Sequence, residues 1–454
     1  MSYKHLSNTG KTKLIQDQEP WRPIHYLGSK LRILEKIESN LNQITSKATP
    51  VCDLFAGSGT VSSWLGKTRK VTAIDIQEYS RILCSALLSD NKIFIKKNKN
   101  KLENQLKNIH KHQSLIVAEP LIEIEENLMS QAKNGDTEQL AMMIESGSLM
   151  TAKNDIKNDF QIAMNHCWKQ IEKFPKENYL STMTLRHFGG IYFSFKQAAE
   201  IDALLDMAEN YIGLEKDLFT AAILATASEV VNTVGKHFAQ PLRPRDKEGK
   251  VKKSLYNQTS KDRNKSITKN FLYSLEKFCL NYSANFNHEA IRSDYLDYLS
   301  SKECNESIIY ADPPYTRDHY SRFYHVLETL SLRDDPEISS NKAHGKTMLS
   351  RGIYRKNRHQ SPFCIRNQAP KAFQLLFSKI SEKKLPLVLS YSPYSSEKNA
   401  HPRVMTIDQI REIALNFFSK VDIDSVGKFS HSKLNRTALN KEISFDSEYL
   451  FICR

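Results

Sequence analysis

The sequence lacks the patterns that mark membrane, secreted and disulfide-bonded proteins. No apolar run approaches the roughly 18–20 residues of a membrane span, and the start, MSYKHLSNTGKTKLIQ, has no apolar centre of the kind a signal peptide needs. The seven cysteines, at positions 52, 84, 167, 279, 304, 364 and 453, form no CxxC pair. We therefore expect a cytoplasmic protein with reduced, buried cysteines and no metal site.

A nucleotide-binding P-loop is also missing. Three Gly-Lys-Thr triplets occur, but a P-loop needs a glycine five residues before the first glycine of the triplet. Those positions hold His5, Val61 and Ser340. This excludes an NTPase of the Walker type.

What the chain has in excess is positive charge. Its 454 residues include 65 Lys and Arg against 51 Asp and Glu, a net charge of +14. Such a balance favours polyanionic partners, of which nucleic acid is the main candidate, because no long amphipathic basic helix suggests a membrane surface. The length suggests two to four domains.

The hydrophobic pattern predicts an α/β fold with a helical interruption. Residues 50–59, TPVCDLFAGS, read as a strand that ends in a glycine-rich turn, and residues 70–76, KVTAIDI, read as a second strand. With a helix between them they predict the start of a doubly wound sheet. Helical patterns dominate from about 96 to 284, and strand patterns resume at 307–311 and 385–391. We expect one domain from 1–95 and 285–454, interrupted by a helical domain at 96–284.

The first candidate site motif is DLFAGSG, Asp53 to Gly59. Gly57 and Gly59 allow a sharp turn and a close approach to a ligand, and the following helix can polarise that ligand. Asp75 ends the next strand, where a carboxylate can accept hydrogen bonds from ribose hydroxyls. The alternative is a tight turn beside a solvated acid.

The second motif is DPPY, which follows the strand-like IIYA and comprises Asp312, Pro313, Pro314 and Tyr315. Two prolines cannot continue a central strand, so they fix an extended turn. The Asp312 carboxylate and the Pro313 carbonyl then provide two acceptors beside an aromatic ring. This arrangement suits the exocyclic amine of a planar base. The alternative is a proline turn with a capping aspartate.

Together these motifs resemble the Dam-like, alpha-ordered class of S-adenosylmethionine (AdoMet)-dependent DNA adenine-N6 methyltransferases. In that class the AdoMet motif comes first, a target-recognition domain follows, and DPPY comes last. HYLGSK, His25 to Lys30, is similar to the N-terminal motif of the class. The resemblance implies a Rossmann-like, seven-stranded AdoMet-binding domain with a large, mostly helical target-recognition insertion.

The resemblance also implies roles for single residues. Tyr26 and Lys30 would line the cofactor and base pocket. Asp53, with the backbone of Gly57 and Gly59, would hold the methionine end of AdoMet, Phe55 would pack beside it, and Asp75 would hold the ribose. Asp294 matches an acid that contacts the cofactor adenine, and Asp297 competes for that role. These roles are carried over on matching positions: Tyr26, Lys30, Asp53, Phe55, Gly57, Gly59, Asp75 and Asp294.

The reaction implied needs neither a metal nor a covalent intermediate, since the methyl of a sulfonium is already activated. Asp312 and the Pro313 carbonyl would accept hydrogen bonds from the adenine amino group, and Tyr315 would stack on the base. The adenine must be extruded from the duplex to be reached. Cytosine-C5 methylation would need a cysteine in a Pro-Cys turn, and no cysteine here follows a proline.

Two basic segments are candidate DNA contacts. The segment from Lys236 to Lys269 contains many cations, and the segment from Ser350 to Phe363 alternates arginines with aromatic residues. Such segments can follow the phosphates of a DNA backbone, although each could be an ordinary solvated loop. The predicted DNA-binding residues are Arg243, Arg245, Lys252, Lys253, Arg355 and Arg358.

Two other functions compete with this interpretation. An RNA amino-group methyltransferase can also use a DPPY-like turn, but members of that group usually lack a large domain between the two motifs. A DNA-binding specificity subunit without activity is the other, although the intact glycines and Asp312 argue against it. The expected partners are double-stranded DNA and a cognate restriction endonuclease, and the expected state is a monomer.

Overall fold

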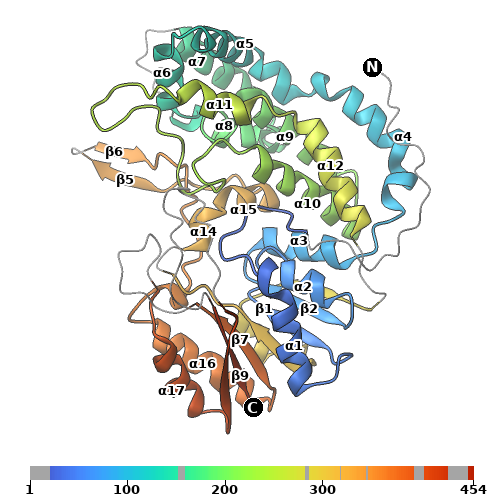
Figure 1. The fold of residues 1–454 in the computed structure, drawn as a ribbon. Helices are drawn as coiled ribbons and strands as arrows, with labels where there is room; N and C mark the ends of the chain where they lie inside the picture. Colours follow the sequence, from blue (N-terminus) through green and yellow to red (C-terminus); the bar gives the residue numbers. More distant parts are fainter. Residues whose placement is uncertain are drawn as a thin grey trace.

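A computed structural model describes residues 21–151, 159–281, 286–316, 319–343, 346–392, 403–427 and 448–454. Seven strands form one sheet in the order β3-β2-β1-β4-β7-β9-β8 (Figure 1). They are β1 (Val51–Leu54), β2 (Val71–Asp75), β3 (Glu289–Arg292), β4 (Ile308–Ala311), β7 (Leu387–Tyr391), β8 (Val421–Ser425) and β9 (Tyr449–Cys453). Only β9 runs antiparallel to its neighbours. The predicted seven-stranded α/β sheet is therefore confirmed.

Helices cover both faces of this sheet because its strands are apolar on both sides. Val51 and Val71 pack on α1 (Leu34–Ile44), α2 (Thr60–Leu65) and part of α3 (Glu78–Leu88). Cys52 and Ile309 pack on the opposite face against α13 (Tyr295–Ser300), α16 (Ala369–Glu382) and α17 (Ile407–Leu415). The alternation of neighbouring residues between the two cores fits the two-residue period of a strand.

The order of the strands places a ligand site at the ends of β1 and β4. Strand β1 lies between β2 and β4, and its Leu54 is in register with Ala311 of β4. The residues that follow, Phe55 and Asp312, therefore leave the sheet at the same edge. The segments that leave β1 and β4 turn to opposite faces of the sheet. Ligands of doubly wound folds bind at such a point.

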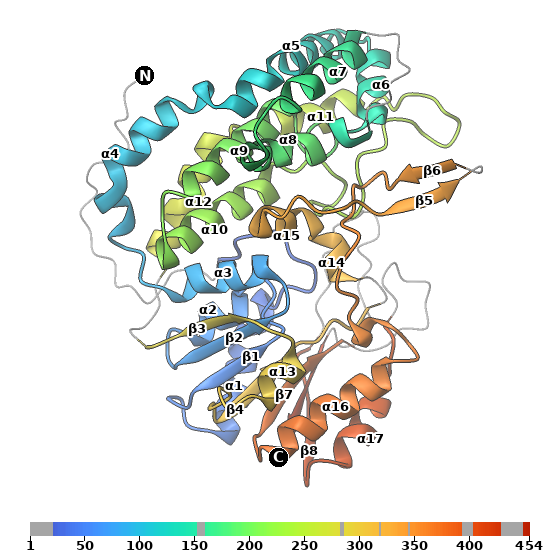
Figure 2. The ribbon, with the colours of Figure 1, turned by 180° about the vertical axis from the view of Figure 1, so that it is seen from behind.

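A thick layer of helices lies beyond α3, on the side away from the sheet (Figure 2). It contains α4 (Phe94–Lys107), α5 (Gln113–Lys133), α6 (Glu138–Ser146), α7 (Asp159–Ile171), α8 (Met183–Phe188), α9 (Phe195–Ala208), α10 (Gly213–Val230), α11 (Leu255–Arg263) and α12 (Ile267–Leu280). Most of these helices lie in the region from about 96 to 284, where the sequence predicted helical patterns. A two-stranded hairpin, β5 (Ser340–Ala343) and β6 (Lys346–Leu349), projects near this layer.

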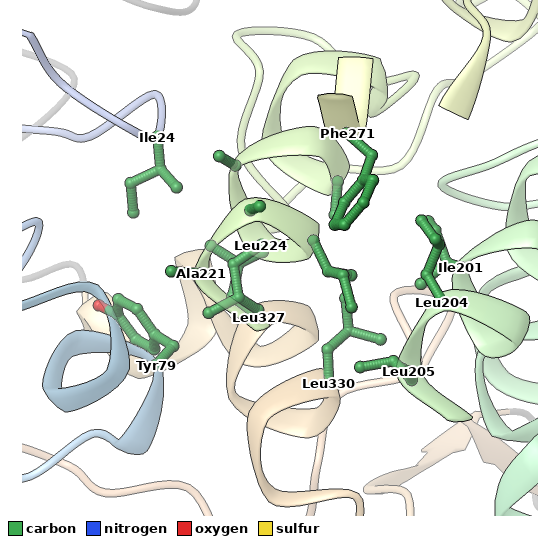
Figure 3. Close-up of a cluster of buried hydrophobic side chains, with 14 of the residues drawn as sticks. Ile24, Tyr79, Ile201, Leu204, Leu205, Ala221, Leu224, Phe271, Leu327 and Leu330 are labelled. Atoms are coloured by element: carbon green, nitrogen blue, oxygen red, sulfur yellow. The ribbon is translucent and has the colours of Figure 1, made fainter. Parts of the chain in front are cut away.

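The helical layer and the sheet domain share one hydrophobic core. Tyr79 of α3 and Leu327 of α15 (His325–Leu332) belong to the same buried cluster as Leu204 of α9, Leu224 of α10 and Phe271 of α12 (Figure 3). An ion pair reinforces this packing, since Arg81 of α3 donates two hydrogen bonds to Asp217 of α10, at 2.8 and 2.7 Å. The domain limits at 95/96 and 284/285 remain a prediction.

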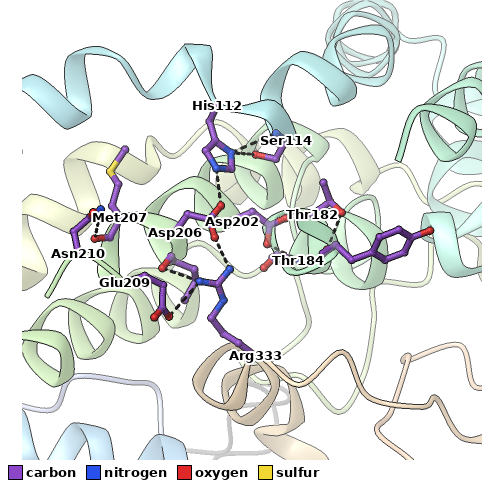
Figure 4. Close-up of polar contacts among 12 residues, drawn as sticks. His112, Ser114, Thr182, Thr184, Asp202, Asp206, Met207, Glu209, Asn210 and Arg333 are labelled. Atoms are coloured by element: carbon purple, nitrogen blue, oxygen red, sulfur yellow. Dashed lines mark hydrogen bonds and ion pairs between the residues drawn. The ribbon is translucent and has the colours of Figure 1, made fainter. Parts of the chain in front are cut away.

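Polar contacts join α9 to three other parts of the chain (Figure 4). Arg333, just after α15, donates to the carboxylate of Asp206 and to the Leu205 carbonyl, the latter at 3.0 Å. The same Asp206 bonds to the His112 ring, at 2.8 Å, at the start of α5. Asp202 accepts from two backbone N–H groups at the start of α8, both at 2.8 Å. These contacts fix α9 between the ends of its neighbours.

All seven cysteines are buried and free, as predicted. Among the described residues, no helix is long and apolar enough to cross a membrane.

Candidate active site

A pocket opens at the edge of the sheet where β1, β2 and β4 end. Its wall includes Tyr26, Phe55, residues 74–77 and 79, residues 293–295, residues 312–314, Tyr320, Ser321, His359, Ser361 and Pro362. The pocket thus brings together the glycine-rich turn, the acid after β2 and the DPP of the second motif. All three segments were candidate site motifs in the sequence analysis.

The turn after β1 has an unusual backbone. Phe55 has a φ of +65°, and Gly57 and Gly59 have φ values of +56° and +72°. Only the glycines adopt such angles freely, and a non-glycine residue there carries strain of about 1–3 kcal/mol. The Phe55 ring is held by contacts with Tyr295, at 5.2 Å, and Phe363, at 5.4 Å, between ring centroids. These contacts keep the strained residue in the pocket wall.

Asp75 anchors the same turn. Its two carboxylate oxygens accept hydrogen bonds from the backbone N–H groups of Gly57 and Gln77, both at 2.9 Å. Burial raises the pKa of Asp75, and these hydrogen bonds oppose the rise. The carboxylate therefore holds the glycine turn against β2 and also faces the pocket.

Asp53 lies beneath the turn and is absent from the pocket wall. Its side chain is buried, and its Oδ2 accepts a hydrogen bond from the Ser62 hydroxyl at 2.5 Å. Burial raises the pKa of Asp53 to about 7. Its Oδ1 is buried, and none of the described residues forms a hydrogen bond with it. This oxygen is an unused acceptor next to the glycine turn.

The two candidate acids near α13 occupy different environments. Asp294 lines the pocket and caps α13, since its Oδ1 accepts from the backbone N–H of Leu296 at 2.8 Å. Asp297 is exposed on that helix and is not part of the pocket wall. The geometry therefore favours Asp294.

His359 lines the pocket, although the sequence did not predict it as a pocket residue. Burial lowers the pKa of His359, and the charges of Asp294 and Asp75 oppose this. The ring thus stands within electrostatic reach of both pocket acids. The available signal was its place in the segment from Ser350 to Phe363, which was predicted to contact DNA.

Asp312 is held by a buried row of three charges. The Lys30 Nζ lies 2.9 Å from the Asp312 Oδ2 and 3.0 Å from a Glu448 oxygen. Glu448 in turn accepts a hydrogen bond from the Ser390 hydroxyl at 2.6 Å. Burial raises the pKa of Asp312, Lys30 opposes this rise and Glu448 adds to it. The Asp312 Oδ1 is buried and finds no hydrogen-bond partner within the described residues.

The row places Lys30 behind the turn that carries Asp312. Lys30 is only 5% exposed and is absent from the pocket wall. No sequence pattern marks Glu448, which precedes β9 at the far end of the chain. The fold alone brings this acid to the second motif.

Tyr315 also lies behind the turn, in contrast to Pro313 and Pro314. Its side chain is buried and is absent from the pocket wall. The Arg403 guanidinium carbon lies 5.1 Å and the Lys30 Nζ lies 5.4 Å from the centre of the Tyr315 ring. Cations therefore occupy the space next to this ring.

Tyr26 reaches the pocket from the segment before α1. Its ring stacks on Tyr324 with 4.9 Å between centroids, and the Tyr324 hydroxyl accepts a hydrogen bond from the Leu27 N–H at 2.7 Å. Tyr324 and His325 themselves are buried outside the pocket wall. His325 thus occupies a core position.

The predicted DNA-binding residues divide into two groups. Arg245 is paired with Glu138 and Glu145, and Arg355 makes two hydrogen bonds to Asp334, at 2.7 and 2.5 Å. Ion pairs within the chain therefore already engage these two arginines. The other four predicted residues are less engaged. Arg243 and Lys253 are exposed, and Arg358 is half-buried. The Lys252 Nζ donates a hydrogen bond to the Arg243 carbonyl.

Comparison with known proteins identifies relatives along most of the chain. The family model described as D12 class N6 adenine-specific DNA methyltransferase matches residues 26–188 and 144–386. Type II methyltransferase M.NlaIII of Neisseria lactamica is 22% identical over 440 residues, which cover 94% of this chain and 98% of that protein. Type II methyltransferase M.FokI of Planomicrobium okeanokoites is 24% identical over 375 residues, 81% of this chain but only 44% of that protein. Modification methylase LlaI of Lactococcus lactis subsp. lactis is 28% identical over 142 residues, 31% of this chain and 20% of that protein.

Proposed function

Because the chain belongs to the D12 class N6 adenine-specific DNA methyltransferase family, we propose that it transfers a methyl group from AdoMet to the N6 amino group of an adenine extruded from duplex DNA. The observation that carries this proposal is a single pocket lined by Phe55, Asp75 and the Asp312-Pro313-Pro314 turn. The order of motifs, with helices between the glycine turn and DPPY, supports the Dam-like group within the family. We assign target recognition to the helical region 96–284.

The residues around the glycine turn fit AdoMet. Asp53 lies beneath the glycine turn rather than in the pocket wall, and its Oδ1, without a hydrogen-bond partner among the described residues, would accept a hydrogen bond from the ammonium group of the methionine end. Asp75 and Asp294 line the pocket and would bind the ribose and the adenine, and Tyr26 and Phe55 supply apolar walls. Bound there, AdoMet supplies a methyl group that its positive sulfur has already activated.

The Asp312 turn would hold the adenine amino group. The Oδ1 of Asp312 and the carbonyl of Pro313 would each accept a hydrogen bond from one N–H of the amino group. These two hydrogen bonds direct the lone pair of the nitrogen away from the base ring. Both acceptors are fixed before the base arrives, Asp312 by Lys30 and Pro313 by the proline turn, so little reorganisation is needed during transfer. Tyr320 lies in the pocket wall and is better placed than Tyr315 to contact the base.

Methyl transfer itself is the direct test. The purified chain is incubated with radiolabelled AdoMet and either duplex DNA or RNA, and the labelled nucleosides are identified. We expect N6-methyldeoxyadenosine from duplex DNA and no label in RNA. Label in RNA alone would support the RNA methyltransferase instead, and no label in either would contradict the proposal.

The relatives support a role beside a restriction enzyme. Two of them carry the name type II methyltransferase and a third is a modification methylase. We propose that this chain acts as a monomeric modification enzyme that protects DNA from a cognate endonuclease. Long-read sequencing of DNA from cells that express it would reveal one methylated motif, and randomly scattered methylation would contradict site-specific modification.

Replacing Asp75 with asparagine should weaken AdoMet binding by about tenfold. The substitution removes the charge from an acceptor of two backbone N–H groups and of the proposed ribose, and a hydrogen bond to a charged group is worth about 1.5–3 kcal/mol. Isothermal calorimetry measures the affinity. Glu289→Gln, on the exposed edge strand β3, is the control. Unchanged AdoMet affinity in Asp75→Asn would refute the assignment.

Gly57 allows a matched test of the turn. A Cβ at Gly57 would lie 2.5 Å from the Tyr26 hydroxyl, whereas at Gly213, which has nearly the same φ, it would meet nothing within 4 Å. Both Gly57→Ala and Gly213→Ala incur backbone strain, but only Gly57→Ala displaces Tyr26. Since overpacking costs ~1–3 kcal/mol, we expect Gly57→Ala alone to weaken AdoMet binding by about tenfold or more. Equal affinities in the two variants would show that Tyr26 packing is unimportant for the cofactor.

A further inference from the structure

Three segments that are distant in sequence meet beside the pocket. Phe238 donates its backbone N–H to the carbonyl of Phe323, at the end of α14 (Tyr320–Phe323), at 2.9 Å. The Tyr354 hydroxyl donates to the carbonyl of Ala239, and the Arg351 guanidinium donates to the carbonyl of Leu242 at 2.9 Å. The segments around 238–243, 320–323 and 351–358 thus form one connected platform.

Four arginines project from this platform, and we call them the arginine strip: Arg243, Arg322, Arg351 and Arg358. The guanidinium carbons of Arg322 and Arg358 lie 5.3 and 5.0 Å from the centre of the same Tyr354 ring. Arg351 is close enough to Arg243 for their charges to repel. Three of the four side chains are exposed, and only Arg358 is half-buried.

No acid among the described residues forms an ion pair with any member of the strip, although neighbouring arginines are neutralised. Arg355, in the same loop, is bound by Asp334, and Arg245, two residues after Arg243, is bound by Glu138 and Glu145. The charge of Glu145 reaches Arg351, but its carboxylate is bonded to Arg245. The Arg358 Nη1 is buried and has no hydrogen-bond partner in the part of the chain that the structure describes. Positive charge is therefore concentrated here without an internal counterion.

The strip begins at the rim of the pocket. Arg322 directly follows Ser321, and Arg358 directly precedes His359, and both neighbours belong to the pocket wall. From there the strip continues through Arg351 to Arg243, in the predicted DNA-binding loop. A polyanion that enters the pocket with one of its bases must carry its own phosphates past this rim.

We propose that the arginine strip binds the phosphates that flank the extruded adenine on the strand to be methylated. This proposal rests on the function proposed above and extends it to a named DNA contact. A guanidinium matches a phosphate with two parallel hydrogen bonds. Packing on Tyr354 orders Arg322 and Arg358 before DNA arrives, so less side-chain entropy is lost on binding. Phosphate contacts set the position of the duplex, and here they would hold the extruded nucleotide at the pocket.

The salt dependence of DNA binding tests this proposal. We compare the wild-type chain with Arg322→Gln/Arg358→Gln, using fluorescence anisotropy with a duplex oligonucleotide over a range of salt concentrations. Each phosphate contact contributes about 0.9 to the slope of log affinity against log salt. We expect the double variant to lose roughly 1.8 from that slope, while calorimetry shows unchanged AdoMet affinity.

Two controls keep the outcome clear. Arg245→Gln removes the same charge from an arginine that is already neutralised, so we expect its slope to stay near that of the wild type. Arg322→Gln alone alters an exposed residue and should lose about half the effect of the pair if the double variant does not fold. An unchanged slope in a folded variant, or an equal loss in Arg245→Gln, would overturn the proposal. A wild-type chain that binds DNA but transfers no methyl would instead refute the proposed function.

Discussion

Replacing Asp312 with alanine is expected to lower methyl transfer to duplex DNA by at least ~100-fold, the effect of losing one fixed electrostatic contact to a reacting group. Among the described residues, nothing bonds to the buried Asp312 Oδ1, and the other oxygen of this carboxylate is held by Lys30, so in our proposal no other carboxylate oxygen of the DPP turn can replace it as acceptor. AdoMet affinity should change little, because the proposed cofactor contacts come from other segments. Single-turnover transfer of labelled methyl and calorimetry measure the two quantities.

The control for this experiment is Asp297→Ala, which removes an exposed carboxylate outside the pocket. Lys30 keeps Glu448 as its partner when Asp312 is removed, so we expect the variant to fold. If Asp312→Ala retained more than a few per cent of the wild-type rate, Asp312 could not be the acceptor of the amino hydrogens.

The buried charge row should control the pH dependence of the reaction. An ionised Asp312 is the better acceptor, and burial raises its pKa, so activity should fall as the pH is lowered through a value well above that of an exposed aspartate. Lys30 lowers this pKa and Glu448 raises it. Lys30→Met should therefore move the acid limb of the pH–rate profile upward by about 1–3 units. Glu448→Gln should move it downward.

The two substitutions are expected to shift the pH–rate profile in opposite directions, which makes the test specific to the ionisation of Asp312. Both substitutions disturb the same buried row, so a general loss of stability would lower the rate in both variants without separating the two profiles. We would measure single-turnover rates between mildly acidic and alkaline pH, with melting temperatures recorded at each pH. Shifts in the same direction would show that the row does not set the ionisation of Asp312.

Short-range signals predicted the centre of the site. The glycine turn and the DPP turn each follow a short apolar strand, and parallel pairing of β1 with β4 then brings Phe55 and Asp312 to one edge. Asp294 and Asp297 could not be separated from sequence, because they carry the same side chain and lie three residues apart in one segment. The start of α13 separates them, since it leaves Asp294 at the pocket and Asp297 on the surface.

Ion pairs between residues that are distant in the sequence limit how well a run of basic residues predicts DNA contacts. Arg245 and Arg355 look as available as Arg358 in the sequence, yet Glu138 and Asp334 neutralise the first two. The partner of Arg245 is 107 residues away, so no local pattern reveals it. Glu448 was missed for the same reason, because its meeting with Lys30 depends on β9 lying beside β7.

The core shared by α3, α15 and the helical layer has a consequence for engineering. A chimera that transplanted residues 96–280 from a relative onto this sheet would bring α9, α10 and α12 against partners that they did not evolve with. Leu224 and Phe271 would be exchanged, whereas Tyr79 and Leu327 would stay behind. A working hybrid must therefore include the core-facing residues of α3 and α15 together with the transplanted helices, so the junctions between the two parent sequences belong within the sheet domain.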